Sequence, residues 1–227
     1  MNRVAFIPAR GGSKRLPRKN IMKFLGKPMI SYTINAAHSS GLFDRVVVST
    51  EDEEIAQISK EYGAEIDVRS LELATDSATI KDVCIDFLKR ESFNGKNYDV
   101  LCVLYATAPL RNSKDIQQVV SLLDPGKCDF SLAVTQYDLP PHQALKKWGG
   151  DALAPFMPEL ISARADTVGE LCVDNGSTYA VSVPAFIKQQ SFYGQNLCGY
   201  DMPRNRSVDV DTQDDFDLVT YYAERIK

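Results

Sequence analysis

Short apolar runs alternate with amphipathic stretches along the first half of the chain. This alternation is typical of parallel strands joined by helices that cover both faces of one sheet. The run at 100–105 is the most apolar and is expected at the sheet's centre. The pattern predicts an α/β fold with strands at 4–8, 45–49, 65–68, 100–105 and 130–135, and with helices at 28–39, 51–62, 80–90 and 115–123.

The alternation stops after Tyr137. Prolines and a Gly-Gly pair interrupt the segment at about 137–170, which also holds Trp148. Long loops without regular structure are uncommon unless they have a role, so we interpret this excursion as a lid or a subunit-contacting arm. A long ordered surface loop is the alternative. The chain is expected to return to the sheet at 177–183, to add a final strand at 207–210 and to end in a helix from 212, all within one domain, 1–227.

Composition excludes several classes of protein. The chain has 227 residues, 44% of them hydrophobic, and a net charge of −4, which gives no general reason to bind nucleic acid or an anionic membrane. Five widely spaced cysteines form no C-x-x-C pair, which argues against zinc and thioredoxin-like sites. The start has no long apolar core, so neither a signal peptide nor a spanning helix is expected. We expect a cytoplasmic protein with reduced cysteines.

A basic, glycine-containing loop follows the first predicted strand. It holds Gly11 and Gly12 beside Ser13, and five cationic side chains, Arg10, Lys14, Arg15, Arg18 and Lys19. Glycines let backbone N–H groups turn inward, and Lys and Arg add charge that suits phosphate oxygens. The loop predicts a nucleotide phosphate site; a solvated turn is the alternative. Neither G-x-G-x-x-G nor a Walker A sequence occurs there, which argues against a nicotinamide dehydrogenase and a P-loop kinase.

Two carboxylates, Asp209 and Asp211, flank Val210 near the C-terminus. In an extended chain alternate side chains share a face, and two close carboxylates repel unless a cation neutralises them. Mg²⁺ favours one or two carboxylates together with substrate phosphates. The pair predicts a metal site, with a helix N-cap role for Asp211 as the alternative.

Six segments in order resemble the acylneuraminate cytidylyltransferases, the family of CMP-sialic acid and related CMP-nonulosonic acid synthetases. The resemblance runs from Arg3 to the C-terminal helix, with only the excursion hard to place. The segments are A-R-G-G-S-K-R-L-P-R-K-N at 9–20, S-T-E-D-E-E-I-A at 49–56, the stretch from Arg69 to Asp76, T-A-P-L-R at 107–111, D-N-G-S-T-Y at 174–179 and D-V-D-T at 209–212.

The resemblance implies a Rossmann-like nucleotide-diphospho-sugar transferase fold and Mg²⁺-dependent transfer of CMP from CTP to a nine-carbon keto-sugar acid. It further implies a homodimer. The residues it assigns are Arg10, Lys14 and Lys19 for the triphosphate and the leaving group, with Gly11, Gly12 and Ser13 in the same loop; Asn20, Arg69, Asp76 and Ser77 for the nucleotide; Asn175 and Gly176 near the sugar; and Asp209 and Asp211 for the metal.

One departure from the family concerns the sugar. Many sialic acid-specific members have Gln-Pro where this chain has Tyr105-Ala106. A Tyr105 that lines the sugar site points to a 5,7-diamino nonulosonate, pseudaminic or legionaminic acid, as an alternative to N-acetylneuraminate. A Tyr105 that only packs is the other interpretation. Arg164, on the excursion, is either a ligand of the sugar carboxylate or a surface arginine.

Two rival functions stay open. The first is nucleotidyl transfer to another keto-sugar acid such as the eight-carbon Kdo, although the tyrosine and serine-threonine usual in that loop are absent here. The second is a module that binds CTP without turnover. Lys19, Asp209 and Asp211 argue against such a module, because it has little need for both a leaving-group cation and a metal pair.

Overall fold

The computed structural model describes residues 1–226 and is built on a seven-stranded sheet in the order β11-β7-β10-β6-β1-β4-β5. In this sheet β10 runs antiparallel to β6 and β7, and the other neighbouring pairs are parallel. The predicted α/β fold with a mostly parallel sheet is therefore confirmed. The strands are β1 (Arg3–Pro8), β4 (Arg45–Thr50), β5 (Glu65–Val68), β6 (Val100–Leu104), β7 (Phe130–Gln136), β10 (Cys172–Ser182) and β11 (Leu197–Asp201).

Strand β6 occupies the middle of the sheet, as its uniform hydrophobicity predicts, and all five of its residues are buried. The parallel strands β1, β4, β5 and β6 end at one edge of the sheet. The loops that follow them contain the basic loop, the Glu51–Asp52 turn, Arg69 and Tyr105. Ligand sites of open α/β sheets lie at this carboxyl edge.

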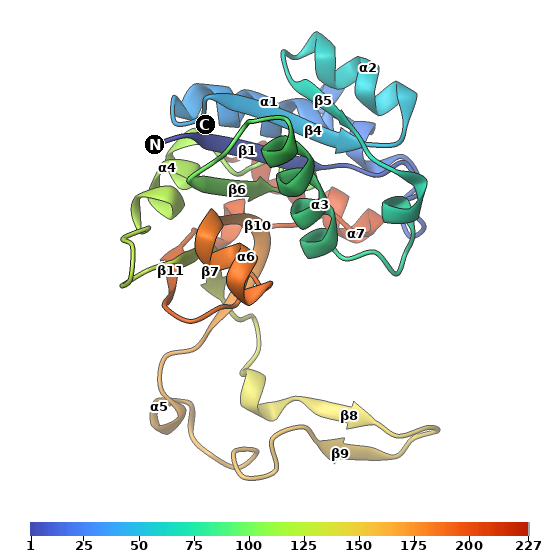
Figure 1. Ribbon diagram of the computed structural model, residues 1–227. Coiled ribbons are helices and arrows are strands. Elements are labelled where there is room, and N and C mark those ends of the chain that lie inside the picture. The colour runs from blue at the N-terminus through green and yellow to red at the C-terminus, as the bar shows by residue number, and fades with distance from the viewer. Residues whose placement is uncertain (227) are drawn as a thin grey trace.

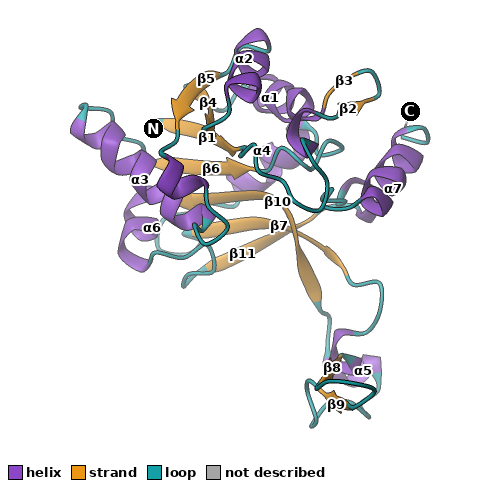
Figure 2. Cartoon of the chain, turned by 90° about the vertical axis from the view of Figure 1, so that its right-hand side faces the viewer, coloured by secondary structure: helices purple, strands orange, loops and turns teal. Residues whose placement is uncertain are grey.

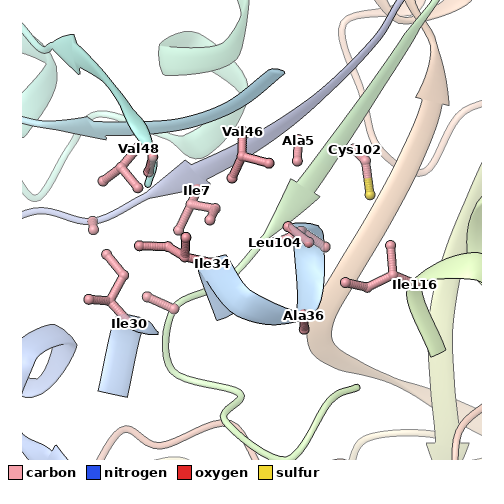
Figure 3. Packing of buried hydrophobic residues seen from close by; sticks show 14 of the residues in the cluster. Ala5, Ile7, Ile30, Ile34, Ala36, Val46, Val48, Cys102, Leu104 and Ile116 are labelled. Carbon is pink, nitrogen blue, oxygen red and sulfur yellow. The ribbon is translucent and has the colours of Figure 1, made fainter. Parts of the chain in front are cut away.

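Helices cover both faces of the sheet (Figure 2). On one face Ile30 and Ile34 of α1 pack with Ile116 of α4 against the strands (Figure 3). Ile55 of α2 belongs to the same cluster. The other face is covered by α3 and α6, while α7 packs beside the basic loop through Val219. The helices are α1 (Met29–Ser40), α2 (Glu53–Glu61), α3 (Ile80–Phe93), α4 (Ser113–Ser121), α6 (Val183–Gln189) and α7 (Gln213–Ala223).

Local sequence signals explain where several helices begin and end. Gly41 follows α1 with a left-handed φ of 65°, a conformation that costs a residue without Cβ little. Thr79 and Asp82 form a capping box at the start of α3, and Thr212 and Asp215 form one at the start of α7. The C-terminal helix thus starts where the sequence predicts.

The excursion leaves the sheet as an arm, residues 137–171, between the end of β7 and the start of β10 (Figure 1). It stands away from the body of the protein in both views (Figures 1 and 2). Its elements are the 3-10 turn η3 (Pro141–Gln143), a two-stranded hairpin of β8 (Leu145–Lys147) and β9 (Leu153–Pro155), and the short helix α5 (Ala165–Val168).

The strand predicted at 207–210 does not form, and this prediction was wrong. Residues 204–206 make the 3-10 turn η4, and the hydroxyl of Ser207 donates back to the carbonyls of Met202 and Pro203. The N–H of Val210 donates to the carbonyl of Thr107 at 2.9 Å without extending into a ladder. The last strand of the chain is instead β11, which lies at one edge of the sheet. It was not predicted because Gly199 and Asp201 are residues that strands disfavour.

Shorter elements complete the description. The basic loop contains the 3-10 turn η1 (Lys19–Ile21) and leads into a small hairpin of β2 (Lys23–Phe24) and β3 (Lys27–Pro28). The polar segment before α3 contains the 3-10 turn η2 (Leu71–Ala74). Among residues 1–226, no helix combines the length and the apolar character needed to cross a membrane.

Candidate active site

The basic loop after β1 is braced by acidic residues at the end of the neighbouring strand β4. The N–H of Gly11 donates to Glu51 Oε1 at 2.7 Å. The guanidinium of Arg18, a residue with a left-handed φ of 58°, pairs with Asp52 and Glu54. These contacts fix the path of the loop and turn its remaining cations toward the carboxyl edge of the sheet.

There is no room for a side chain at Gly11 among these contacts. A Cβ at Gly11 would lie 2.5 Å from Asp52 Oδ2, and Asp52 also caps α2 by accepting the N–H of Ile55. We therefore expect Gly11→Ala to lower the free energy of unfolding by about 1–2 kcal/mol through loss of the cap and the Arg18 pair. At Gly12 a Cβ would meet nothing within 4 Å. In chemical denaturation, Gly12→Ala should keep a free energy of unfolding close to that of wild type. Equal losses of unfolding free energy in the two variants would contradict the role of Asp52 in bracing the loop.

A cavity of about 470 Å³ opens beside the loop at the carboxyl edge of the sheet. Its lining combines cationic side chains of the basic loop with aliphatic side chains of the segment before and within α3. Its lining includes Arg10, Ser13, Lys14, Arg15, Lys19 and Asn20 from the loop, Arg69, Leu73, Thr75, Asp76, Ala78, Ile80 and Val83 from the segment before and within α3, Tyr105, Ala106 and Thr107 after β6, and Asp211.

Four loop cations at this cavity share two carboxylates from distant parts of the chain. Arg10 contacts Asp76 at 2.7 Å, and Lys14 pairs with the same carboxylate. Lys19 Nζ lies 2.6 Å from Asp211 Oδ1, and Arg15 pairs with Oδ2. The cations outnumber the carboxylates, so this part of the cavity lining is suited to a ligand that carries several negative charges.

Asp76 is the partner that a ligand could replace most easily. Its side chain is 52% exposed and holds only Arg10 and Lys14 as ion-pair partners among the described residues. Hydrogen bonds from Lys14 and Arg10 hold the pKa of Asp76 below its usual range. Exposed ion pairs contribute little to stability, so a polyphosphate can take over these two cations at small cost.

Asp209 and Asp211 do not share a strand face, because residues 207–210 form no strand. Asp211 lines the main cavity, whereas Asp209 lines a neighbouring hollow of about 470 Å³ at the base of the arm. Thr107 Oγ1 donates to Asp209 Oδ1, and a Cβ on Gly176 would lie 3.3 Å from Asp209 Oδ2. The two carboxylates, one on each side of Val210 in the sequence, therefore line two different hollows.

The electrostatics of the two carboxylates differ. Burial raises the pKa of Asp209, which forms no ion pair with any described residue. Burial also acts to raise the pKa of Asp211, but the hydrogen bond from Lys19 and the charges of Lys19 and Arg15 outweigh it, and that pKa lies below its usual range. Within residues 1–226, no group of three or more His, Cys, Asp or Glu side chains is arranged to hold a metal ion.

The donor set nevertheless fits Mg²⁺. This ion takes oxygen ligands, commonly one or two carboxylates with the rest from substrate phosphates and water. Asp209 supplies a partly buried carboxylate that forms no ion pair with any described residue, and Asp211 supplies one at the cavity. A metal at this position would therefore depend on phosphate oxygens to complete its coordination.

The residues assigned to the nucleotide divide into two groups. Arg69 is 5% exposed and donates to the carbonyl of Ser49 at 2.8 Å; burial lowers its pKa. Asn20 is also buried and donates to the carbonyl of Arg10 at 2.9 Å. Both line the cavity. Gly11, Gly12 and Ser77 lie outside its lining, and the hydroxyl of Ser77 lies 3.1 Å from that of Thr75.

Of the residues assigned to the sugar, only Tyr105 lines the main cavity. Gly176 lies against Asp209. Asn175 is buried and donates to the hydroxyl of Ser207 at 3.0 Å, away from the lining residues. Arg164 lies on the arm, pairs with Asp166 at 3.2 Å and is 82% exposed. The structure does not bring Arg164 to the cavity of its own chain.

Arg111, to which the sequence analysis assigned no role, holds the loop after β6 that carries the cavity residue Tyr105. Its side chain is fully buried and donates to the carbonyl of Ser177 at 2.8 Å, to that of Tyr105 at 3.3 Å and to Thr33 Oγ1 at 2.6 Å. Burial lowers its pKa to about 10. Arg111 thereby ties the end of β6 to β10. An arginine inside the apolar T-A-P-L-R turn was the available signal.

Comparison with known proteins identifies the family of the chain. The cytidylyltransferase family model matches residues 4–141. A pseudaminic acid cytidylyltransferase of Campylobacter jejuni is 34% identical over 96% of this chain and 94% of the relative. A CMP-N,N'-diacetyllegionaminic acid synthase of Legionella pneumophila is 32% identical over 99% of this chain and 97% of the relative.

A solved structure shares the fold at low identity. A CMP:2-keto-3-deoxy-manno-octonic acid synthetase complexed with CTP superposes with a TM-score of 0.70, at 15% identity, covering 99% of each chain. This likeness concerns the fold alone. The family-model match and the full-length relatives show more: the chain belongs to the cytidylyltransferase family, as a nucleotidyltransferase of the CMP-nonulosonate synthetase type.

Proposed function

We propose that the protein transfers CMP from CTP to the anomeric hydroxyl of a 5,7-diamino nonulosonic acid and releases pyrophosphate. The observation that carries the proposal is the 470 Å³ cavity, whose lining combines the cations of the basic loop with Asp211 and Tyr105. Relatives of matching length are named for pseudaminic and legionaminic acid. N-acetylneuraminate is the second candidate, since N-acylneuraminate cytidylyltransferases are also similar to this chain.

The reaction needs no enzyme nucleophile. The anomeric oxygen attacks the α-phosphorus, the bond from that phosphorus to the bridging oxygen breaks, the hydroxyl proton is lost and pyrophosphate departs. Negative charge grows on the departing group, and preorganised cations stabilise it most effectively. We assign this role to Lys19, with Arg10 and Lys14 holding the triphosphate. Lys19 is largely buried and is fixed by Asp211 and the carbonyl of Val210, so it is already oriented.

Asp209 and Asp211 are the residues that would hold Mg²⁺. Bound there, the ion would neutralise charge on the triphosphate. Thr107 orients the Asp209 carboxylate through its hydroxyl, and Gly176 leaves room beside that carboxylate because it lacks a Cβ.

The arm supports a homodimer. It exposes apolar side chains that its own chain does not cover, namely Tyr137, Leu139, Leu145, Trp148, Leu153 and Phe156. Contiguous exposed apolar surface marks an interaction site, and a second copy is the occupant that we propose. Because Arg164 lies outside the cavity of its own chain, contact between Arg164 and a sugar carboxylate would require that second copy. We also propose a cytoplasmic location, which the five unpaired cysteines support.

Tyr105 is expected to influence sugar choice. Its ring packs edge-on against Tyr179 at 5.7 Å between centroids and lines the cavity. An extra acylamino group gains apolar contact with such a wall, and one pocket contact is worth about 1–3 kcal/mol. We expect kcat/KM to favour a 5,7-diacetamido nonulosonate over N-acetylneuraminate, and Tyr105→Gln to narrow the difference. Equal kcat/KM in wild type, or an unchanged ratio in the variant, would show that Tyr105 only packs.

The proposed function is tested by pyrophosphate release. The protein is incubated with CTP, Mg²⁺ and, separately, a 5,7-diacetamido nonulosonate, N-acetylneuraminate and Kdo. Release with a nine-carbon acid supports the proposal, and highest kcat/KM with the diacetamido acid supports the sugar assignment. Preference for Kdo would favour the eight-carbon alternative. CTP binding without release in any reaction would favour a non-catalytic CTP-binding module.

A further inference from the structure

Asp174 forms a polar cluster with Gly176, Tyr179 and Tyr193 next to the cavity. The reaction described above gives this cluster no role. Asp174 lies in β10, where the pairing with β7 shifts register between it and Tyr179. Its Oδ2 accepts the hydroxyl of Tyr179 at 2.7 Å and that of Tyr193, and its Oδ1 accepts the N–H of Gly176 at 2.9 Å. Asp174 forms no ion pair with any residue in the described part of the chain.

The carboxylate keeps room for one more donor. A carboxylate offers about four lone-pair positions, and three are used here. Burial and the hydrogen bond to Asp174 raise the pKa of Tyr193 to about 12, so its hydroxyl stays protonated and keeps donating. The remaining position is on Oδ1. Asp174 is only half-buried, so a ligand can reach it.

The cluster also lies between two parts of the proposed reaction site. Tyr179 packs against Tyr105, which lines the cavity, at 5.7 Å between ring centroids. Gly176, whose N–H binds Asp174, lies against Asp209. A sugar held between Tyr105 and Asp209 would therefore meet Asp174. The adjacent Asn175 is buried and donates to Ser207 instead.

We propose that Asp174 is a specificity-determining residue whose free Oδ1 position accepts the N–H of an acylamino group on the sugar. The inference rests on the proposed function and deepens it. A carboxylate without a cationic partner repels other anions, so Asp174 also keeps the sugar's own carboxylate turned away.

The test compares three sugars in wild type and in Asp174→Asn. The sugars are a 5,7-diacetamido nonulosonate and two analogues in which the 5- or the 7-acetamido group is replaced by acetoxy, which keeps the acyl group and removes the N–H. A hydrogen bond to a charged group is worth roughly 10- to 100-fold in affinity. We expect wild type to favour the diacetamido sugar by this factor in kcat/KM over one analogue. Asp174→Asn keeps an amide oxygen that accepts an N–H without charge assistance, so we expect it to reduce that preference.

Two matched variants distinguish recognition of the sugar by Asp174 from a structural role of Asp174 in holding the tyrosines. Asp201→Asn removes the same charge from an exposed position of the edge strand β11 and should retain the preference. Tyr193→Phe removes one of the hydroxyls that Asp174 accepts and should also retain it. CTP binding by calorimetry confirms that each variant is folded.

Three outcomes would overturn the assignment. The first is an Asp174→Asn variant that lowers kcat/KM for all three sugars by one factor, which would show that Asp174 only supports the tyrosines. The second is a wild type that does not discriminate between the sugars. The third is a wild type that releases pyrophosphate with none of them, which contradicts the proposed function itself.

Discussion

Asp211→Ala is expected to reduce the rate of pyrophosphate release by roughly 10³-fold, the effect of losing several kcal/mol of transition-state stabilisation. The carboxylate is a proposed metal ligand, and it also positions Lys19, whose Nζ lies 2.6 Å away. Single-turnover rates at saturating CTP and Mg²⁺ measure the loss. Circular dichroism should show an intact fold, because the N-cap of α7 is supplied by Thr212 rather than by Asp211.

Asp214→Ala is the control for this experiment. Asp214 is an exposed acidic residue in the first turn of the same helix, so it shares any interaction with the helix dipole but lines no part of the cavity. It should keep turnover near wild type and lose only a few tenths of a kcal/mol of stability. Similar turnover in Asp211→Ala and wild type would contradict the metal assignment and favour a structural role at the helix start.

Lys19→Ala is expected to lower kcat by roughly 10²- to 10³-fold while KM for CTP changes by less than tenfold. A preorganised charge aimed at the leaving group acts mainly in the transition state. Lys19 is suited to this because its ammonium is held by Asp211 and the carbonyl of Val210. Steady-state kinetics at varied CTP separate the two constants.

Lys14→Ala gives the opposite pattern if the assignments are right. Lys14 is 78% exposed and pairs only with the exposed Asp76 in the described part of the chain. It should raise KM for CTP with little change in kcat. A Lys19→Ala variant with raised KM and unchanged kcat would show that Lys19 merely docks the nucleotide.

Much of the fold was predictable because local signals and the sheet agree. The buried strands β1, β4 and β6 each contain a run of apolar residues, and Gly41 ends α1 where the sequence predicts. The change of rhythm after Tyr137 located the arm. In these segments propensity, burial and turn chemistry all indicate the same structure.

The failures occur where tertiary contacts override the local pattern. The segment 207–210 alternates like a strand, but Ser207 is committed to Asn175 and to nearby carbonyls, so no ladder forms. Strand β11 and helix α6 were not predicted, since β11 is a half-exposed edge strand that gains its order from pairing with β7. Edge strands have weak sequence signals because only one side is paired.

The candidate site also has parts that the sequence predicts and parts that it does not. Four of the five loop cations line one cavity, whereas Arg18 pairs with Asp52 and Glu54. The partners of these cations were not predictable, because Asp76 and Asp211 come from distant segments. In the D-N-G turn the sequence pointed to Asn175, but the register shift in β10 buries Asn175 and leaves Asp174 half-exposed beside the tyrosines. A bulge cannot be located from alternation alone.

The central claim is direct transfer of CMP from CTP to the anomeric oxygen of a nonulosonic acid. The most direct test uses a 5,7-diacetamido nonulosonate labelled with ¹⁸O at the anomeric hydroxyl, with the products of reaction with CTP and Mg²⁺ analysed by mass spectrometry. The account predicts a CMP-sugar that retains the ¹⁸O between sugar and phosphorus, together with unlabelled pyrophosphate. Unlabelled CMP-sugar, or bound CTP with no CMP-sugar formed, would contradict it.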